Sequence, residues 1–509
     1  MNKMRNIVWC LVFLVTGLWG CYDDKGNYDY KELPGLEIDT TGLNISGEKI
    51  AYQFQTLLVD PKINYAGNKE NLSYSWRLYP TNPVLDADKN KFDTIKPLAT
   101  TPVFNEVIYN APDSYYLTLT VEDKSVDVKY YWTCKIKVES ELTSGLCVLD
   151  ERDGEYDLNL IKSARLITNL NQEDEGALYN IFSQVNNGQK IEDGRFLGLS
   201  GSSVLNGVYV FAKNSNSYKL NFNTFESITE GFGDLFTFSL GITPDPACFA
   251  RSTNGPTELF INDGLLYYVD HMAMGGAKTF GEVTGPVYDA APFIAEVNTS
   301  TYTSVIFDKS QHRFLGAARS TVKEFLNLPS DAVWNINKVN KELVYLGSGM
   351  DNETYAVFND EGTSNYYLYV ANFTEASSDE NPTPAKAVAI YDMNNCPGVT
   401  NSTLFTFGNL GKVCYYAAGD KLYQYNYTES ANKANPIADF PAAGETITYL
   451  KVFKQNNHVQ NGKTLIVGTW NGTEGKVYLV NFNEVSGTLD LKSTQSFGQF
   501  GKIVDALFK

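Results

Sequence analysis

Apolar and polar side chains alternate along residues 36–142 with a period of two. The clearest run has apolar side chains at every second position: Leu72, Tyr74, Trp76 and Leu78. Runs at 115–121 and 130–138 repeat the pattern. One apolar and one polar face are typical of antiparallel strands buried on one side. A chain of this length with such strands fits an immunoglobulin-type β-sandwich, and the parity of Trp76 predicts a core tryptophan.

From Gly145 onward the pattern changes to recurring hairpins, each an aromatic strand, a polar turn and a second strand. We predict turns near residues 152, 215, 263, 352, 420 and 473. Turn residues such as Asp263-Gly264 tolerate a positive φ, which tight hairpins require. The wide gap between 263 and 352 leaves room for a further hairpin over Thr301 to Phe314. Units of about 50 residues indicate a β-propeller of roughly six to eight blades, with seven favoured.

One segment breaks this pattern. Residues Ser320–Leu328 begin with a capping serine and carry apolar side chains at helical spacing, which predicts one short helix. The remainder of the chain predicts an all-β fold, with a sandwich over residues 36–142 and a propeller over residues 143–509.

The N-terminus has the pattern of a signal sequence over residues 1–20. Lys3 and Arg5 precede the apolar run Ile7–Trp19, which at 13 residues is shorter than the about 20 that a helical membrane span needs. The sequence Leu18-Trp19-Gly20-Cys21 resembles a bacterial lipobox, which predicts lipidation of Cys21 and a tether over residues 21–35. Ordinary secretion with a coincidental cysteine is the alternative.

The net charge of the chain narrows the classes of partner that we expect. The chain carries 41 basic and 59 acidic residues, a formal net charge of −18. A nucleic-acid-binding protein needs a basic face for the phosphates, so we expect no nucleic acid partner. Asp23 and Asp24 follow the predicted lipidation site and resemble the export signal of Bacteroidetes surface lipoproteins. A solvated acidic tether is the alternative for these two residues.

The motifs of common catalytic and metal sites are missing from the sequence. It has no HExxH, GxSxG or GxxxxGK[ST], and its three histidines are far apart. The cysteines beyond Cys21 have no regular spacing, so we interpret them as buried apolar residues, with a Cys396–Cys414 disulfide as the alternative. We therefore predict no catalytic residue, no metal site and no cofactor. Calcium at Asp150–Gly154 is an alternative to a simple hairpin turn there.

Binding residues are expected on long loops and exposed aromatic side chains. The segment Asp270–Gly281 is rich in Gly and Met and follows a predicted strand, and loops of this kind often line binding surfaces. A connection without a role in binding is the alternative. Aromatic faces also stack on sugars and peptides, which suggests Trp334 and Trp470 as exposed platforms, although packing in the core explains these two residues equally well. The candidate binding residues are His271, Phe280, Tyr288, Trp334 and Trp470.

The lipobox, the segment Tyr22–Tyr30, the Trp76 strand and the segment Gly145–Gly154 together resemble the PKD-like family lipoproteins of Bacteroidetes. This resemblance covers nearly the whole chain. It implies an N-terminal PKD/Ig-like sandwich, a lipid anchor in the outer membrane facing the cell exterior, and a SusC/SusD-like importer as partner. We therefore expect a non-catalytic accessory of nutrient uptake, which binds a glycan or peptide substrate or the importer through the propeller. The alternatives are a propeller-type surface glycosidase or lyase, and a structural scaffold that docks partner proteins.

Overall fold

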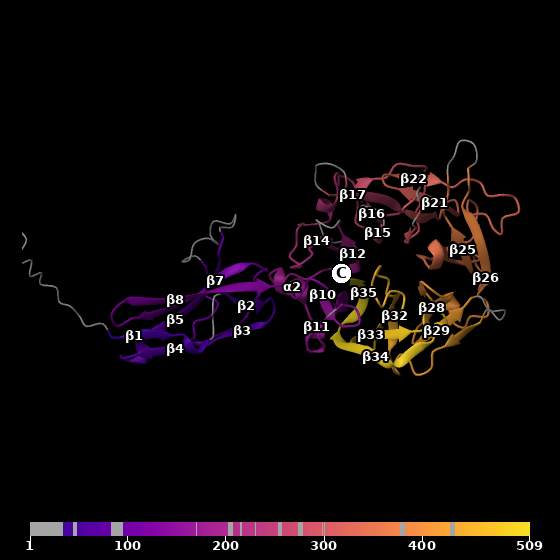
Figure 1. Cartoon of the computed structure of the whole chain (residues 1–509). Helices are drawn as coiled ribbons and strands as arrows, with labels where there is room; N and C mark the ends of the chain where they lie inside the picture. The colour runs from indigo at the N-terminus through magenta and orange to yellow at the C-terminus, as the bar shows by residue number, and fades with distance from the viewer. Residues whose placement is uncertain are drawn as a thin grey trace, which may run out of the picture. The chain divides into compact units, whose positions relative to one another are not determined.

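The chain is all-β and divides into two compact units, Met1–Glu139 and Ser140–Lys509 (Figure 1). The computed structural model describes residues 34–43, 48–82, 95–168, 170–201, 207–213, 216–229, 231–252, 257–272, 278–297, 299, 301–376, 382–427 and 433–509. Cys21 and most of the predicted tether lie outside these ranges. Within the described residues, no helix has both the length and the apolar character needed to cross a membrane.

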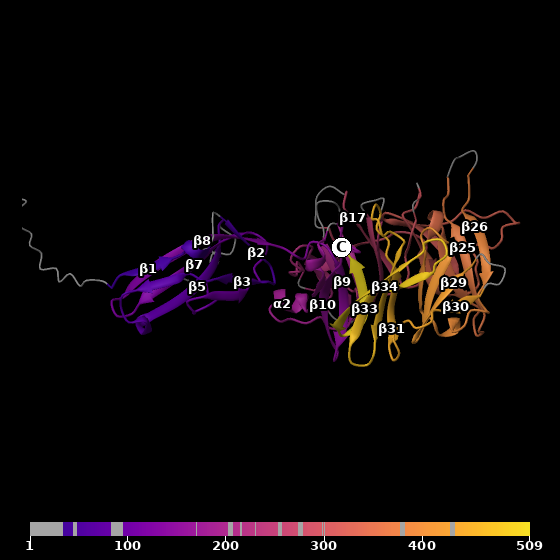
Figure 2. The same cartoon turned by 60° about the horizontal axis from the view of Figure 1, so that its bottom comes forward.

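The first unit contains a four-stranded sheet and two smaller ones (Figure 2). The large sheet has the order β2 (Glu48–Tyr52), β8 (Val128–Glu139), β7 (Ser114–Asp123) and β5 (Leu72–Pro80). The two-stranded sheets pair β1 (Leu36–Asp39) with β4 (Lys62–Tyr65) and β3 (Thr56–Val59) with β6 (Phe104–Val107). Short 3-10 helices, η1 (Thr41–Leu43) and η2 (Lys69–Asn71), lie between strands.

Trp76 is in the core of the first unit, as its parity predicts. The side chain is fully buried and its ring packs against Phe104 and Trp132. Its indole Nε1–H donates a hydrogen bond to the Thr101 carbonyl at 2.9 Å, so the one polar atom of the ring has a partner.

The described strands of the second unit form seven sheets of antiparallel strands. Their strands, in sheet order, are β11 (Gly176–Leu178), β10 (Glu155–Lys162), β9 (Leu146–Arg152) and β35 (Lys502–Phe508); β12 (Gly194–Ser200), β13 (Gly207–Ala212) and β14 (Tyr218–Asn221); β15 (Pro246–Arg251), β16 (Thr257–Asn262), β17 (Leu265–Asp270) and β18 (Gly281–Glu282); β19 (Ala295–Glu296), β20 (Ser304–Asp308), β21 (Arg313–Ala318) and β22 (Thr321–Glu324); β23 (Glu342–Ser348), β24 (Thr354–Asn359), β25 (Tyr366–Asn372) and β26 (Lys386–Asp392); β27 (Leu404–Phe407), β28 (Val413–Ala418), β29 (Lys421–Asn426) and β30 (Ala434–Pro436); and β31 (Thr446–Val452), β32 (Thr464–Trp470), β33 (Gly475–Phe482) and β34 (Leu489–Phe500).

Helical segments in this unit are short. They are α2 (Ile181–Val185), η5 (Gln172–Asp174), η6 (Phe232–Leu235), η7 (Met350–Asn352) and η8 (Val399–Asn401). The helix predicted over Ser320–Leu328 is wrong, because this segment contains β22, which pairs with β21. In β22, Val322 is buried and packs in a core cluster, whereas Lys323 and Glu324 are exposed. A β-branched residue at that position favours the strand over the helix.

The predicted hairpins are confirmed by strand pairing. The turns at Asp153-Gly154, Asp263-Gly264 and Gly419-Asp420 join antiparallel neighbours, and positive φ occurs at Asp153, Gly154, Asp263, Gly264 and Gly419. The extra hairpin expected between 263 and 352 is formed by β20 and β21. The turn near 215 lies partly outside the described residues, and the strands on either side of it, β13 and β14, pair antiparallel.

One edge strand from each sheet contacts its counterparts in the two neighbouring sheets. We call these the ring strands: β12, β15, β19, β23, β27, β31 and β35. Each ring strand contacts the next in the order β35, β12, β15, β19, β23, β27 and β31. The last of these, β31, contacts β35 again. The sheet that contains β9 is built from both ends of the unit, since β35 pairs with β9.

The ring strands end at a common edge, which we call the exit edge. Contacts between residues at or near the strand ends establish this. The rings of Phe453 and Phe508 pack against each other. Hydrogen bonds run from Val452 N–H to Thr406 Oγ1, from Ser348 Oγ to the Glu296 carbonyl, from Lys509 Nζ to the Phe222 carbonyl and from Gly201 N–H to Glu258 Oε1. The hairpins that leave the ring strands therefore lie at one edge of the unit.

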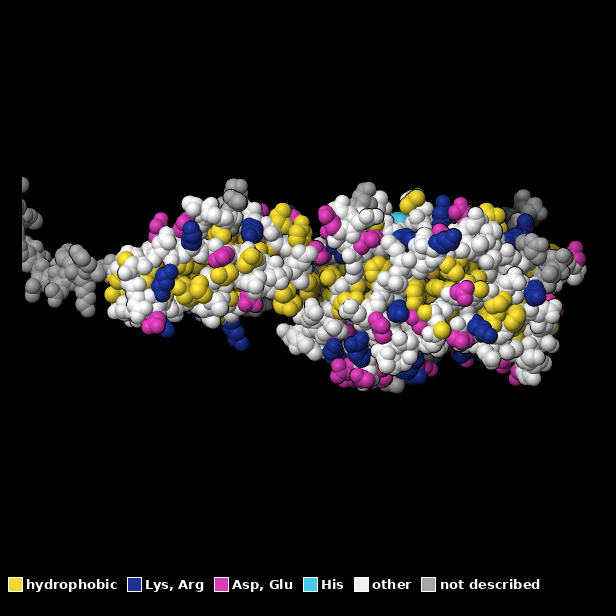
Figure 3. Space-filling model, turned by 90° about the horizontal axis from the view of Figure 1, so that it is seen from below, with side chains coloured by type: hydrophobic (Ala, Val, Ile, Leu, Met, Phe, Trp, Pro, Cys, Tyr) yellow, Lys and Arg dark blue, Asp and Glu magenta, His cyan; other side chains and the backbone are white. Residues whose placement is uncertain are grey.

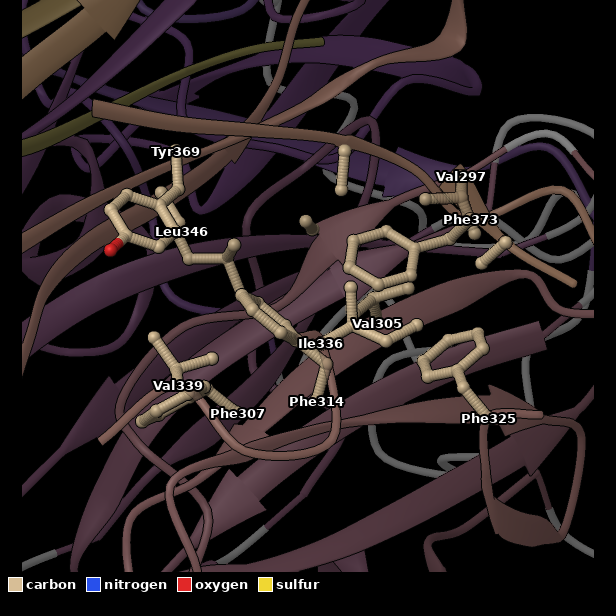
Figure 4. Close-up of a cluster of buried hydrophobic side chains, with 14 of the residues drawn as sticks. Val297, Val305, Phe307, Phe314, Phe325, Ile336, Val339, Leu346, Tyr369 and Phe373 are labelled. Atoms are coloured by element: carbon tan, nitrogen blue, oxygen red, sulfur yellow. The ribbon is translucent and has the colours of Figure 1, made fainter. Parts of the chain in front are cut away.

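Apolar side chains fill the space between neighbouring sheets. In the cluster of Figure 4, Phe314 and Phe307 come from one sheet and Tyr369 from the next, and Phe373 follows directly after that sheet's third strand. The surface of the second unit is mixed: on the face shown in Figure 3, basic and acidic side chains are interspersed among uncharged ones. The charge of the chain is therefore not gathered into one continuous patch on this face.

Candidate functional site

A buried glutamate and a histidine meet at the exit edge, where β16 begins and β17 ends. Glu258 is the second residue of β16, and His271 follows the last residue of β17. Because these strands pair antiparallel, the two side chains come together. Nε2 of His271 lies 2.5 Å from Oε1 of Glu258, and the two side chains are 1% and 0% exposed. A carboxylate at this position orients the imidazole and fixes which nitrogen faces it.

The neighbouring sheet supplies two further groups to Glu258. The backbone N–H of Gly201, just past the end of β12, donates to Oε1 at 2.6 Å. The hydroxyl of Tyr209 in β13 donates to Oε2 at 3.2 Å. Both carboxylate oxygens therefore accept hydrogen bonds, which a buried carboxylate needs in order to offset its loss of hydration.

Lys219 completes this network, which we call the Glu258 cluster: Gly201, Tyr209, Lys219, Glu258 and His271. Its Nζ donates to the Tyr209 hydroxyl at 3.3 Å. Burial raises the pKa of Tyr209 well above its ordinary value, and the Glu258 charge adds to the effect, so the phenol stays protonated. Burial lowers the pKa of Lys219, and the charge of Glu258 opposes that shift. The cluster thus links a buried glutamate to a lysine through the Tyr209 hydroxyl.

The second ring nitrogen of His271, Nδ1, is the atom of the cluster that could bind a ligand. Among the described residues, Nδ1 is buried and has no hydrogen-bond partner. When Nε2 carries the proton that faces Glu258, Nδ1 presents a free lone pair. Buried polar atoms in native proteins rarely lack a partner, so this nitrogen is suited to accept a hydrogen bond from a bound group.

Phe280 and Tyr288 take packing positions. Phe280 is 1% exposed and lies in an aromatic core cluster, where its ring centroid is 5.5 Å from that of Tyr209. Phe280 thus touches the Glu258 cluster only through the ring that supports it. Tyr288 is half-buried, and its hydroxyl accepts the Leu266 N–H at 3.2 Å. These contacts explain both residues without a ligand.

The two tryptophans differ from each other. Trp334 is 8% exposed and its ring packs against Phe314 and Tyr369, so it has little surface to offer a ligand. Trp470 is the last residue of β32, at the opposite end of its sheet from the exit edge, and is half-buried. The structure brings none of the other four candidate residues into direct hydrogen bonding with His271.

Glu258, Tyr209 and Lys219 were missed by sequence reasoning. Glu258 carries a signal that could have been used, since it is a charged residue in the otherwise uncharged strand Thr257–Asn262. A charged side chain inside a buried strand is expected to have a partner. Nothing in the sequence links Glu258 to Tyr209, because the two strands belong to different sheets.

Hydrogen bonds within the protein explain the position of Asp150, where calcium is the alternative to a simple hairpin turn. The Asp150 carboxylate accepts hydrogen bonds from the Gly501 N–H at 2.5 Å and from Asn159 Nδ2 at 2.9 Å. Burial raises the pKa of Asp150, whereas a calcium ligand must be ionised. Within the described part of the chain, no group of three His, Cys, Asp or Glu side chains has an arrangement suited to a metal ion.

No disulfide joins the described cysteines to one another. Cys396 and Cys414 lie in the same core cluster. Burial raises the pKa of Cys396 to about 12 and that of Cys414 well above its ordinary value. The thiolate form that reacts is therefore suppressed at both positions.

Comparison with known proteins gives low-identity structural likenesses. A quinonprotein alcohol dehydrogenase-like protein from Bacteroides thetaiotaomicron shares 14% identity at a TM-score of 0.49, covering 94% of this chain and 99% of that one. A protein described as a putative 6-phosphogluconolactonase from Bacteroides fragilis shares 13% identity at a TM-score of 0.37, covering 72% and 98%. No curated protein matches the chain.

The family comparison concerns the N-terminal third of the chain. One family model matches a segment that extends beyond the first unit and ends at the residue before β12. The matched segment therefore includes β9 and β10 of the second unit. Residues 21–193 match the model of the PKD-like family.

Proposed function

We propose that this protein is a non-catalytic, lipid-anchored surface protein that serves as an accessory of a SusC/SusD-like nutrient uptake system in the outer membrane. In this proposal Cys21 carries the lipid, the first unit is a PKD/Ig-like spacer, and the second unit binds the nutrient or the importer. The lipobox-like sequence supports the anchor, and the family match of residues 21–193 supports the PKD-like assignment.

We further propose that the second unit is a seven-bladed β-propeller. Two observations support closure: the contacts of the ring strands return from β31 to β35, and β35 pairs with β9. Pairing the last strand with the first sheet leaves few open sheet edges, which is how propellers protect themselves from unwanted strand pairing. A rigid ring of this kind presents many hairpin loops at one edge.

The single observation that carries the binding role is the Glu258 cluster. It joins two neighbouring sheets at the exit edge and holds a buried His271 nitrogen with no hydrogen-bond partner among the described residues. A fixed acceptor beside a cation and a carboxylate suits a polar ligand that donates hydrogen bonds, such as the hydroxyl groups of a sugar or the amides of a peptide.

A pull-down from solubilised outer membranes tests the accessory role. The C-terminus is a poor place for the affinity tag, because Lys509 is 7% exposed and packs over Phe222 and Phe225. We would insert the tag after Gly362, in the exposed turn between β24 and β25, and confirm by thermal unfolding that the fold is unchanged.

We expect a SusC/SusD-like pair to co-purify with the tagged protein in gentle detergent. The matched control is Cys21→Ala, which removes the proposed lipid site and is expected to reduce both membrane attachment and recovery of the pair. Recovery of the lipidated protein alone would contradict the accessory role.

A further inference from the structure

Two lysines lie at the exit-edge opening of the ring. Lys451 belongs to β31, and Lys454 lies two residues past the end of that strand. Nζ of Lys454 donates a hydrogen bond to the Ser348 carbonyl at 2.7 Å. Ser348 ends β23, and β27 lies between β23 and β31 in the cycle of ring strands. The Lys454 side chain therefore reaches past the intervening sheet, across the end of the space that the ring strands enclose.

A second hydrogen bond ties another sheet to this position. The Ser348 hydroxyl donates to the carbonyl of Glu296, the last residue of β19. Three ring segments that are distant in sequence thus meet at Lys454. Its side chain is exposed to solvent at this end of the ring strands.

The positive charge of the two lysines is poorly compensated. In the described part of the chain, neither Lys451 nor Lys454 has a carboxylate within ion-pair distance, whereas many other lysines do. Burial lowers the pKa of Lys454 to about 8, the charge of Lys451 lowers it further, and Glu296 opposes the shift. The surroundings therefore disfavour the protonated form of Lys454. A bound anion would stabilise that form.

The other titratable groups near Lys451 and Lys454 offset this charge only in part. Asp505 of β35 accepts the Leu197 N–H at 2.7 Å, and burial raises its pKa even though Lys451 acts in the opposite direction. Burial also raises the pKa of Tyr345, Tyr449 and Cys248 above their ordinary values, so these groups are neutral at pH 7.

We propose that Lys451 and Lys454 form a binding site for an oxyanion, the carboxylate, sulfate or phosphate group of a ligand, at the exit-edge opening of the ring. The Lys454 ammonium uses one of its three N–H donors on Ser348, which leaves two for the ligand. An oxyanion placed between the lysines relieves their mutual repulsion and accepts charge-assisted hydrogen bonds from them. The inference deepens the proposed binding role, on which it rests, by naming the chemistry of the ligand.

Titration calorimetry on the purified full-length protein at low ionic strength tests this site. The probes are sodium sulfate, sodium phosphate and galacturonate, with galactose as the uncharged control. We expect saturable binding of at least one anion with one site per chain, and none of galactose. Galacturonate binding more tightly than the inorganic ions would identify a carboxylated sugar as the source of the anion, and the reverse order would identify a free inorganic ion.

Lys454→Gln and Lys451→Gln separate the site from general charge effects. Each is expected to weaken anion binding by about tenfold or more, because each variant removes one charge-assisted hydrogen bond to the anion. Lys463→Gln is the matched control, because Lys463 follows the same loop but pairs with Glu484 at 3.4 Å. Equal binding by all three variants and the parent would overturn the proposal.

A measurement on the unaltered protein covers the case in which a variant fails to fold. Saturating anion is expected to slow labelling of Lys454 by an amine-reactive reagent at least severalfold, as read by mass spectrometry, and to leave Lys463 unchanged. Equal labelling of Lys454 with and without anion would overturn the site. Either result is independent of the pull-down, which reports on the membrane partner and not on the anion.

Discussion

His271 and Glu258 are joined by a 2.5 Å contact between Nε2 and Oε1, with both side chains almost completely removed from water. This pair connects the end of β17 to the start of β16, and through Gly201 and Tyr209 it connects the third sheet of the ring to the second. A pair so buried is costly to break, since each partner would be left with an unsatisfied polar atom.

Glu258→Ala is expected to lower the stability of the second unit by about 3 kcal/mol or more, because His271, Tyr209 and the Gly201 N–H all lose their acceptor. Thermal unfolding followed by circular dichroism measures the change in Tm. Glu361→Ala, in an exposed turn, is the control and should leave Tm within about one degree. Equal Tm values for the two variants would show that the cluster does not stabilise the ring.

Gly501→Ala is expected to weaken the pairing of β35 with β9. A Cβ at this position would lie 2.3 Å from the carbonyl oxygen of Glu151 and 2.7 Å from its carbonyl carbon. Both are backbone atoms, so relief requires the strands to move. We expect a loss of about 1–3 kcal/mol, typical of overpacking.

The control for Gly501 lies in the same sheet. Gly176 in β11 has open space around it, so Gly176→Ala should be nearly neutral. Unfolding in urea, compared at equal protein concentration, distinguishes the two. A Gly501→Ala midpoint that coincides with that of Gly176→Ala would show that the closing sheet tolerates the displacement.

Lys454 is expected to react with amine reagents at a lower pH than an ordinary lysine, with a midpoint near its pKa of about 8. Lys137 is the internal comparison, since its bond to Glu139 raises its pKa. Peptide mapping over pH 7 to 10 gives both profiles in one sample. Coincident profiles would contradict the lowered pKa of Lys454.

The lowered pKa of Lys454 also predicts how the stability of the fold changes with pH. Between pH 8 and 10.5 the unfolded chain keeps a proton on Lys454 that the folded chain has released. The contribution of this residue therefore destabilises the fold below pH 8 and fades as the pH rises towards 10.5. Lys454→Gln should remove this contribution, so the difference in stability between parent and variant should change in that window and stay constant below it.

Trp76→Phe is expected to destabilise the first unit by about 1–3 kcal/mol, because it removes ring volume from a fully buried site and leaves the Thr101 carbonyl without its donor. Tyr131→Phe, at a side chain 60% exposed, is the control. Limited proteolysis of the two variants, monitored by the loss of the first unit, tests the expectation, and equal cleavage rates would contradict it.

The sequence predicted the elements better than it predicted the site. Strand parity around Trp76 and turn residues such as Asp263-Gly264 report local backbone geometry, which the sequence determines directly. The Ser320–Leu328 helix failed because burial of Val322 against a neighbouring strand outweighed local helical spacing. Lys454 carried no local signal, since its environment is set by Ser348, more than a hundred residues away.

Aromatic candidates illustrate a second limit. From the sequence, Trp334 fits a core position and a surface position equally well, and only the packing of neighbouring sheets decides between the two. His271 was chosen for the loop it begins, whereas its environment comes from Glu258 and from strands of another sheet. Composition and spacing do not encode such contacts between sheets.

The pairing of β35 with β9 has a consequence for how the chain folds. Strand β9 is among the first parts of the second unit to be synthesised, and its partner β35 is the last. Until β35 has been synthesised, β9 has an open edge that another chain could pair with, so the nascent protein is at risk of aggregation for as long as β35 is missing. Chains that stop before Lys502 should therefore depend on chaperones more than chains that include β35.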